Sequence, residues 1–303
     1  MAMITYYKRT VLGKSLGKLD GFEVGSWINV VNPNKEELKE IKEKYALDEE
    51  LLEEGLDENE LPRIDFYENK TYIFFKAIAT NNTLATFLVI IGDKFIVTLS
   101  KEELPFIKPI LDGKIKLVTT QKVKMLITLL YENNEQMEKE VAKIVKTVQK
   151  KKNTTKKLME SDMEQLLIYE DELNNLVSAY YYTSLLYSKM IKRIKLFDED
   201  KEELEDLIIE SNQGLNLCRT SMKTIAHIRN YYSIILSNRL NRTIKILTIF
   251  TILIAIPAAV SSIYGMNVPL PLQNHSWTFL YVVGLMIAII SFFVYYFKKK
   301  EVF

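Results

Sequence analysis

The 303-residue sequence contains one cysteine, Cys218, so no disulfide can form within a single chain. This indicates a reducing compartment for the polar part of the chain. With only two histidines, the sequence also offers few of the nitrogen and sulfur ligands that zinc prefers. It has no GxGxxG segment, no Walker lysine motif and no recognisable set of nucleophile and base. We therefore do not expect an enzyme.

Two further absences concern charge and targeting. A net charge of +1 creates no overall field that would attract nucleic acid, so no nucleic-acid partner is expected. The first ten residues, MAMITYYKRT, lack the apolar core of a signal peptide. We therefore expect the polar part of the chain to stay on the cytosolic side.

Charge is almost absent from two long runs near the C-terminus, residues 243–263 and 278–297. Lys245 is the only charged residue in either run. Each run has the length of about twenty residues that an α-helix needs to cross the hydrocarbon core of a bilayer. The sequence therefore predicts transmembrane helices at 244–263 and 278–297, joined by an extracellular loop at 264–277.

Basic residues flank these runs on one side only. Arg239 and Arg242 precede the first run, a Lys-Lys-Lys segment begins the tail at 298–303, and the loop 264–277 has no Lys or Arg. Positive charge is retained on the cytoplasmic side. The pattern predicts a multi-pass cell-membrane protein with both termini and the basic tail in the cytosol.

Residues 1–118 predict a mixed α and β domain. Five short runs rich in β-branched and aromatic residues (ITYYKR, WINVV, TYIFFKAIA, TFLVIIG and KFIVTL) predict strands, the last two around a Gly92-Asp93 turn. NKEELKEIKEKY predicts a helix with Asn34 as its N-cap, and LDEELLEEGL predicts a second short helix. The acidic stretch from Glu49 to Glu60 has two interpretations, a solvated surface or a patch that binds divalent cations.

Helical spacing begins near Thr119. Residues 119–200 predict cytosolic antiparallel helices with a break near Asn153, and a third helix is expected from about Lys201. Because no strong breaker follows, this stalk helix (201–243) is expected to continue into the first transmembrane helix over roughly sixty residues. A helix this long needs partner helices from the same chain or from other copies.

The first transmembrane helix carries a narrow stripe of small or polar residues at three- and four-residue steps. Such a stripe indicates either close helix packing or the wall of a water-filled conduit. One hairpin cannot enclose a conduit, so a pore requires a homo-oligomer of about four to six copies, in which apolar rings near the cytosolic end gate by dewetting. The stripe consists of Asn241, Ile244, Leu247, Thr251, Ala255, Ala258 and Ser262.

A Tyr264-Gly265-Met266-Asn267 tetrapeptide follows this helix. Gly265 is expected to let the chain turn sharply there, and Asn267 offers a neutral amide oxygen. The segments NRTIKILTIF, starting at Asn241, and IPAAVSSIYGMN, ending at Asn267, closely resemble the CorA family of divalent metal-ion channels. The resemblance is residue-specific from about Asn241 to Asn267 and extends over nearly the whole chain in architecture.

This resemblance implies a homopentameric funnel. Its fold class is an α+β cytosolic domain (an α/β/α sandwich), followed by a long stalk helix and a two-helix C-terminal transmembrane hairpin. The stripe lines the pore, Ile244 and Leu247 form the gate, and residues 264–267 form the selectivity loop. Asn267 contacts a hydrated cation through its water shell, which suits Mg²⁺, with Co²⁺ and Ni²⁺ as further candidates. Mg²⁺ is then both the transported ion and the ligand that closes the channel from the cytosol, and no organic cofactor is expected.

The sequence departs from the family at two places. The loop after Asn267 lacks the carboxylate that many members carry, and a stalk position that is acidic in some relatives is Asn230 here. The regulatory metal ligands are therefore not identified; Asp198, Asp200 and Glu202 are candidates alongside the acidic stretch. Two other functions remain open, a zinc transporter of the related ZntB type and a membrane-anchored coiled-coil scaffold that conducts no ions.

Overall fold

The computed structural model describes residues 3–13, 15–154, 158–268 and 276–299. The chain divides into two compact units, Met1–His227 and Ile228–Phe303. Helix α6 begins in the first unit and ends in the second.

The described part of the first unit contains one seven-stranded sheet in the order β2-β1-β3-β7-β6-β5-β4. Strands β3 and β7 are parallel, and the other neighbouring pairs are antiparallel. The strands are β1 (Met3–Lys8), β2 (Gly17–Leu19), β3 (Ser26–Val31), β4 (Arg63–Tyr67), β5 (Lys70–Ile78), β6 (Leu84–Ile91) and β7 (Phe95–Ser100).

All five predicted strands are confirmed as β1, β3, β5, β6 and β7. Strands β6 and β7 form the expected hairpin, with Ile91 paired to Ile96 across Gly92-Asp93. The sequence did not predict β2 and β4, the two edge strands. β2 has three residues, and β4 (RIDFY) alternates charged and apolar residues without a continuous apolar run.

The predicted N-cap of the first helix is also confirmed. Helix α1 (Lys35–Tyr45) begins with a capping box, in which Asn34 Oδ1 accepts a hydrogen bond from the Glu37 amide at 2.9 Å. In return Glu37 Oε2 accepts one from the Asn34 amide at 2.9 Å. Together they satisfy two amide groups that have no partner within the helix. Helix α2 (Glu49–Glu54) follows, capped by Asp48.

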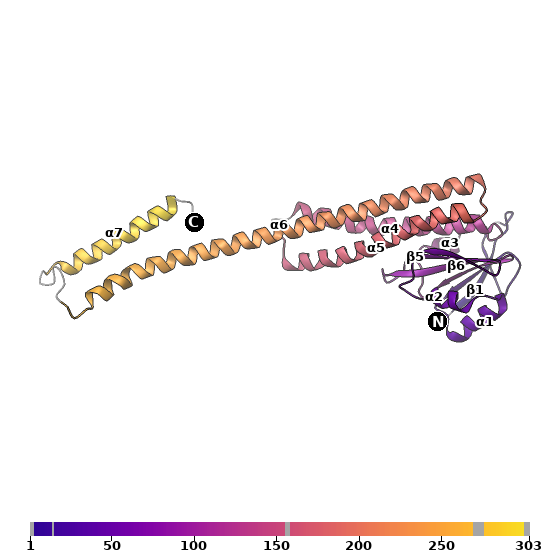
Figure 1. Cartoon of the computed structure of the whole chain (residues 1–303), viewed down its shortest axis with the longest axis horizontal. Coiled ribbons are helices and arrows are strands. Elements are labelled where there is room, and N and C mark those ends of the chain that lie inside the picture. Colours follow the sequence, from indigo (N-terminus) through magenta and orange to yellow (C-terminus); the bar gives the residue numbers. More distant parts are fainter. Residues whose placement is uncertain (1–2, 14, 155–157, 269–275, 300–303) are drawn as a thin grey trace. The chain divides into compact units, whose positions relative to one another are not determined.

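Helices cover both faces of the sheet, which confirms the α/β/α arrangement (Figure 1). On one face, Ile28, Phe74 and Leu88 pack with Ile41 of α1 and Leu52 of α2. The other face packs against α3 (Ile107–Leu111), α4 (Lys122–Asn153), α5 (Glu160–Arg193) and the start of α6. Strands β5, β6 and β7 are buried on both faces and are mostly apolar, as expected for strands that helices cover on both sides.

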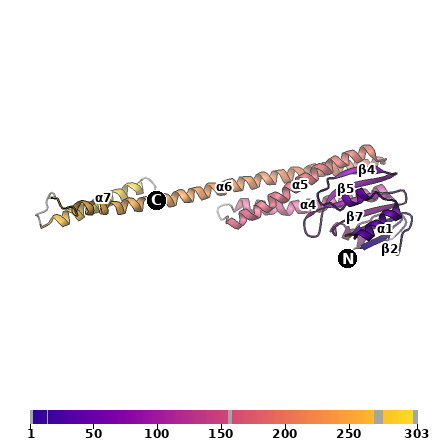
Figure 2. The same cartoon turned by 60° about the horizontal axis from the view of Figure 1, so that its bottom comes forward.

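Helices α4, α5 and the first part of α6 run side by side in the first unit (Figures 1 and 2). Helices α5 and α6 approach closely at Gly214, where a methyl group in place of the glycine hydrogen would lie 2.5 Å from Cζ of Tyr180. The ring of Tyr180 fills this position and is 1% exposed. Glycine is therefore required in this helix by the approach of a neighbouring ring, in spite of its low helix propensity.

Helix α6 (Asp198–Tyr264) has 67 residues and confirms that the stalk continues into the first apolar run. It begins three residues earlier than expected. Its first turn contains Asp198, Glu199 and Asp200, whose negative charges are favourable at a helix N-terminus. Helix α7 (Thr278–Lys299) forms the rest of the described second unit.

Candidate functional site

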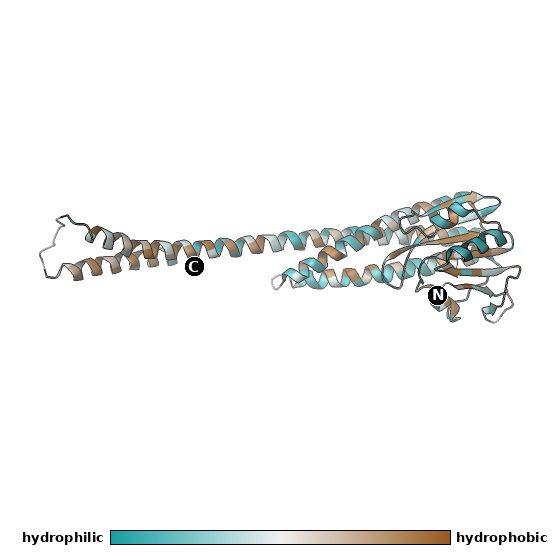
Figure 3. Cartoon of the chain, turned by 90° about the horizontal axis from the view of Figure 1, so that it is seen from below, coloured by the Kyte–Doolittle hydropathy of each residue, from teal (hydrophilic) through white to brown (hydrophobic). Residues whose placement is uncertain are grey.

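Two helices in the described part of the chain, α6 and α7, are long and apolar enough to cross a membrane. Figure 3 shows α7 and the last part of α6 as mostly hydrophobic. Few residues in the most apolar stretch of either helix are fully buried within the chain. Lipid or other copies of the chain must therefore cover this surface, because water would make its exposure costly.

One face of α6 is shielded within the second unit. Ile249 is 4% exposed, and other residues at three- and four-residue steps from it are half-buried. Residues at helical spacing on α7 are half-buried in the same way, so α7 packs along this face of α6. The shielded residues are Ile246, Ile249, Leu253, Ile256 and Val260 on α6, and Val282, Met286, Ile290, Phe293 and Phe297 on α7.

All seven residues of the predicted stripe are exposed. At about 100° per residue, they lie on the side of α6 about 180° from the shielded face. Leu247, for example, is 66% exposed, whereas Ile249 is buried. The face that carries the stripe is thus the face that α7 leaves free, and it is available to other copies of the chain.

The stripe changes in chemistry along the helix. It starts with the amide of Asn241, continues with the side chains of Ile244 and Leu247, and is then small or hydroxylated to Ser262. The hydroxyl of Thr251 donates to the carbonyl oxygen of Leu247 at 2.9 Å. Since that hydrogen is engaged, the exposed Thr251 oxygen is left as a hydrogen-bond acceptor.

Proline does not end this helix. α6 continues through Pro257, which has no N–H, so the carbonyl of Leu253 lacks its usual helical donor. Leu253 belongs to the shielded face. The irregularity therefore lies on the side of α6 that faces α7, away from the stripe.

Tyr264 is the last residue of α6, and Gly265, Met266 and Asn267 follow it. The amide of Gly265 donates to the carbonyl oxygen of Ser261 at 2.9 Å, and that of Met266 donates to Ile263 at 3.2 Å. The side chains of Tyr264, Met266 and Asn267 are exposed. The rest of the expected loop, at 269–275, and the tail from Lys300 lie outside the described residues.

The chain turns at Gly265, as expected, but the glycine does not serve as a left-handed cap. Gly265 does not adopt the left-handed backbone conformation that a C-terminal helix cap uses; among the described residues the glycines that have a positive φ are Gly25 and Gly113. A methyl group at Gly265 would instead lie 3.3 Å from the carbonyl oxygen of Ser261. The close approach to the end of the helix accounts for a small residue here.

In the first unit, several carboxylates of the acidic stretch form ion pairs with basic side chains. Glu54 and Glu60 form ion pairs with Arg63, and Glu58 forms one with Lys101. The hydrogen bond to Glu58 raises the pKa of Lys101 above its ordinary value. These pairs favour the interpretation of the stretch as a solvated, internally neutralised surface.

The other candidates for regulatory metal ligands are not gathered into a site. Within the described residues, no three His, Cys, Asp or Glu side chains are placed to hold a metal ion together. Asp200 is 5% exposed, and Asn230 is exposed on α6.

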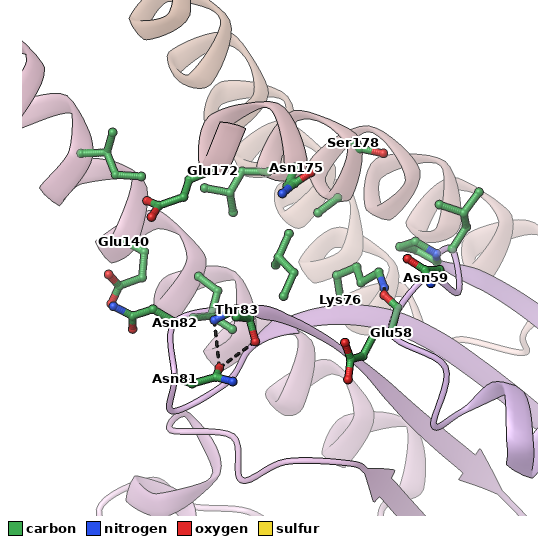
Figure 4. Close-up of a pocket in the computed structure, with 17 residues that line it drawn as sticks. Glu58, Asn59, Lys76, Asn81, Asn82, Thr83, Glu140, Glu172, Asn175 and Ser178 are labelled. Atoms are coloured by element: carbon green, nitrogen blue, oxygen red, sulfur yellow. Dashed lines mark hydrogen bonds between the residues drawn. The ribbon is translucent and has the colours of Figure 1, made fainter. Parts of the chain in front are cut away.

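A recess of about 580 Å³ that contains several charged side chains lies in the first unit between the β5–β6 turn and helices α4 and α5. Figure 4 shows Glu140 and Glu172 at one end and Lys76 with Glu58 at the other. Lys76 is 8% exposed and donates to Thr86 Oγ1 at 3.1 Å; burial lowers the pKa of its ammonium group. Burial, and then the charge of Glu140, raise the pKa of Glu172.

The sequence did not predict this recess. Glu140 and Glu172 lie on different helices, and nothing in the local pattern of either helix marks them as neighbours. Glu140 is also paired with Lys143 at 2.6 Å. The recess and the stripe belong to different units, so the two are separate features of the chain.

Comparison with known proteins adds independent information. A family model described as CorA-like Mg²⁺ transporter protein matches residues 23–299. The cobalt/magnesium transport protein CorA of Methanocaldococcus jannaschii is 27% identical over 296 residues, which cover 90% of each chain.

Two solved structures show the same fold. The complete structure of the CorA magnesium transporter from M. jannaschii has a TM-score of 0.88 and 23% identity, and covers 100% of this chain and 99% of that one. The cytoplasmic domain of ZntB from Vibrio parahaemolyticus has a TM-score of 0.64 and 8% identity, and covers 78% of this chain and all of that domain. Because both identities are low, these likenesses concern the fold and not the ion.

Proposed function

Since the chain belongs to the family of CorA-like Mg²⁺ transporter proteins, we propose that it is a divalent-cation channel that admits Mg²⁺ across the cell membrane. Co²⁺ and Ni²⁺ are further candidate ions, and the curated relative from M. jannaschii is named for cobalt and magnesium. The observation that supports the proposal best is the exposed stripe on α6, which leads without interruption to the Tyr264–Asn267 segment.

In this proposal the channel is a homopentamer. Each copy contributes the exposed stripe of α6 to a central pore, and α7 lies on the outside because it packs on the opposite face of α6. The termini are cytosolic and the loop 264–277 is extracellular, as the distribution of Lys and Arg requires.

Selection takes place at Asn267 in this account. Mg²⁺ dehydrates reluctantly and keeps several of its water molecules when it binds to proteins. The amide oxygen of Asn267 and nearby carbonyl oxygens accept hydrogen bonds from that water shell. The first residue after Asn267 is Val268, and the segment 264–277 contains no carboxylate. Recognition therefore depends on amide and carbonyl dipoles.

Ile244 and Leu247 form the gate near the cytosolic end of the pore. In a symmetric assembly these exposed side chains become apolar rings, which exclude water when they are close together. Cytosolic Mg²⁺ favours this closed state by binding between subunits, and loss of Mg²⁺ lets the carboxylates it had neutralised repel one another. The ligands come from different copies, since one copy brings no three suitable side chains together in its described residues.

Ion flux into proteoliposomes tests this function. We expect the purified wild-type chain to admit Mg²⁺, measured with a trapped indicator dye, and Co²⁺ and Ni²⁺ to compete with it. Entry of Zn²⁺ without entry of Mg²⁺ would favour a zinc transporter of the ZntB type. If no divalent ion enters, the proposal fails and the scaffold function becomes the better account.

A further inference from the structure

Exposed basic residues gather on α6 at the start of its apolar part. Arg239, Arg242 and Lys245 recur at three-residue steps on α6 and are all exposed. These three residues are called the basic face below. They lie in the second unit together with α7, so the two helices can be compared directly.

The basic face points away from the stripe. Arg242 lies four residues before Ile246 and seven before Ile249, which places it on the same side of the helix as these shielded residues. Arg239 and Lys245 lie on either side of that line. The positive charges are thus on the face of α6 that is turned to α7 and not on the face that carries Ile244 and Leu247.

Helix α7 ends where the basic face begins. At 1.5 Å per residue, the distance along α6 from Lys245 to Tyr264 is about 28 Å. The distance along α7 from Thr278 to Lys298 is about 30 Å. Lys298 and Lys299 therefore lie at the depth of Lys245, at the boundary of the apolar runs. Below this depth α6 continues without α7, and its basic face is open.

The chain provides almost no negative charge to balance these cations. No Asp or Glu occurs from Ser211 to Lys300, and Glu301 is the only acidic side chain after Glu210. Each copy has five described cations at or just below this depth: Arg239, Arg242, Lys245, Lys298 and Lys299. Apart from Glu301, the second unit has no acidic side chain to balance them, and lipid phosphates are the anions at the surface of a bilayer.

We propose that the basic face of α6 binds the headgroups of anionic phospholipids from the cytosolic leaflet, beneath the end of α7. Retention of positive charge on the cytosolic side explains why basic residues flank the helices, but it does not require that they share one face. Guanidinium groups bind phosphate oxygens in a bidentate manner, which suits Arg239 and Arg242. The lipid would hold the outer face of the pore helix at a fixed depth in the membrane.

Lipid binding by the purified full-length protein tests this proposal without reference to ion flux. Native mass spectrometry in neutral detergent would count bound phosphatidylglycerol and phosphatidylcholine in parallel titrations. We expect wild type to retain phosphatidylglycerol preferentially, and the double variant R242Q/K245Q to bind it about 30-fold more weakly. The matched control R219Q/K223Q removes two exposed cations from the part of α6 in the first unit and should bind like wild type.

Further measurements with a charge-preserving variant, with high salt and with inorganic phosphate complete the test. The charge-preserving variant R242K/K245R should restore most of the preference for phosphatidylglycerol, and high salt should weaken it in wild type. Inorganic phosphate alone should not displace the lipid at equal concentration. Equal retention by wild type and R242Q/K245Q, equal retention of the two lipids by wild type, or displacement by inorganic phosphate would overturn the proposal.

Discussion

Replacing Asn267 by alanine should reduce Mg²⁺ flux through the reconstituted channel by at least about tenfold. Each copy would lose one amide that accepts hydrogen bonds from the water shell of the ion, worth about 1 kcal/mol net. In a symmetric ring the loss is repeated in every copy at the same depth. Because the segment 264–277 has no carboxylate, no fixed negative charge is present there to compensate.

The control for this variant is Asn238→Ala. Asn238 is also an exposed asparagine on α6, but it precedes the apolar run and lies on the side of the helix away from the stripe. The variant Asn238→Ala should leave the flux of Mg²⁺ unchanged. Flux in Asn267→Ala equal to that of wild type would contradict selection at this segment and would agree with the scaffold function.

Replacing Ile244 by serine should allow Mg²⁺ to leak when the cytosolic side is rich in Mg²⁺ and the channel is otherwise closed. The cost of wetting an apolar side chain of this size is about 1.5–3 kcal/mol. A hydroxyl group in each copy removes that cost, so the leak should rise by about tenfold or more. The measurement is Mg²⁺ entry into proteoliposomes with high Mg²⁺ on the cytosolic side.

The variant Ile246→Ser is a matched control for Ile244→Ser. Ile246 is the same residue type at nearly the same depth, but it belongs to the shielded face of α6. This variant should destabilise the packing of α7 without opening the pore. A leak that is equal in Ile244→Ser and Ile246→Ser would show that disturbance of the hairpin, and not hydration of a gate, causes it.

The membrane hairpin and the long helix could be predicted from the sequence because their signals are local and sustained. The apolar run before Tyr264 has no breaker except Pro257, and a helix tolerates this residue where neighbouring groups relieve the loss of one donor. Asn34 could likewise be predicted as a cap, since a capping box needs only residues three apart.

Features that depend on tertiary contact could not be predicted. The edge strand β4 owes its position to pairing with β5, and its sequence lacks an apolar run. Nothing in the local sequence around Gly214 indicates that the ring of Tyr180 packs against it. Glu140 and Glu172 meet in the recess only because α4 and α5 fold back beside each other.

Helical periodicity predicted which residues of α6 form the stripe, but not what the stripe does. Helical spacing selected seven residues that are all exposed on one side of α6, opposite the residues that α7 shields. The same spacing could not decide between close packing of copies and a wet pore, because small residues serve both. That decision requires a measurement of access to water.

Thiol accessibility along α6 tests the central claim most directly. Cys218, the only native cysteine, is buried, and Cys218→Ser provides a background without a thiol. In that background we expect a membrane-impermeant, thiol-reactive reagent to modify Thr251→Cys, Ala255→Cys and Ala258→Cys and to block Mg²⁺ flux. Leu253→Cys and Ile256→Cys, on the shielded face, should stay unmodified and conduct. Equal modification on both faces, or modification of the stripe without loss of flux, would contradict a pore lined by this face of α6.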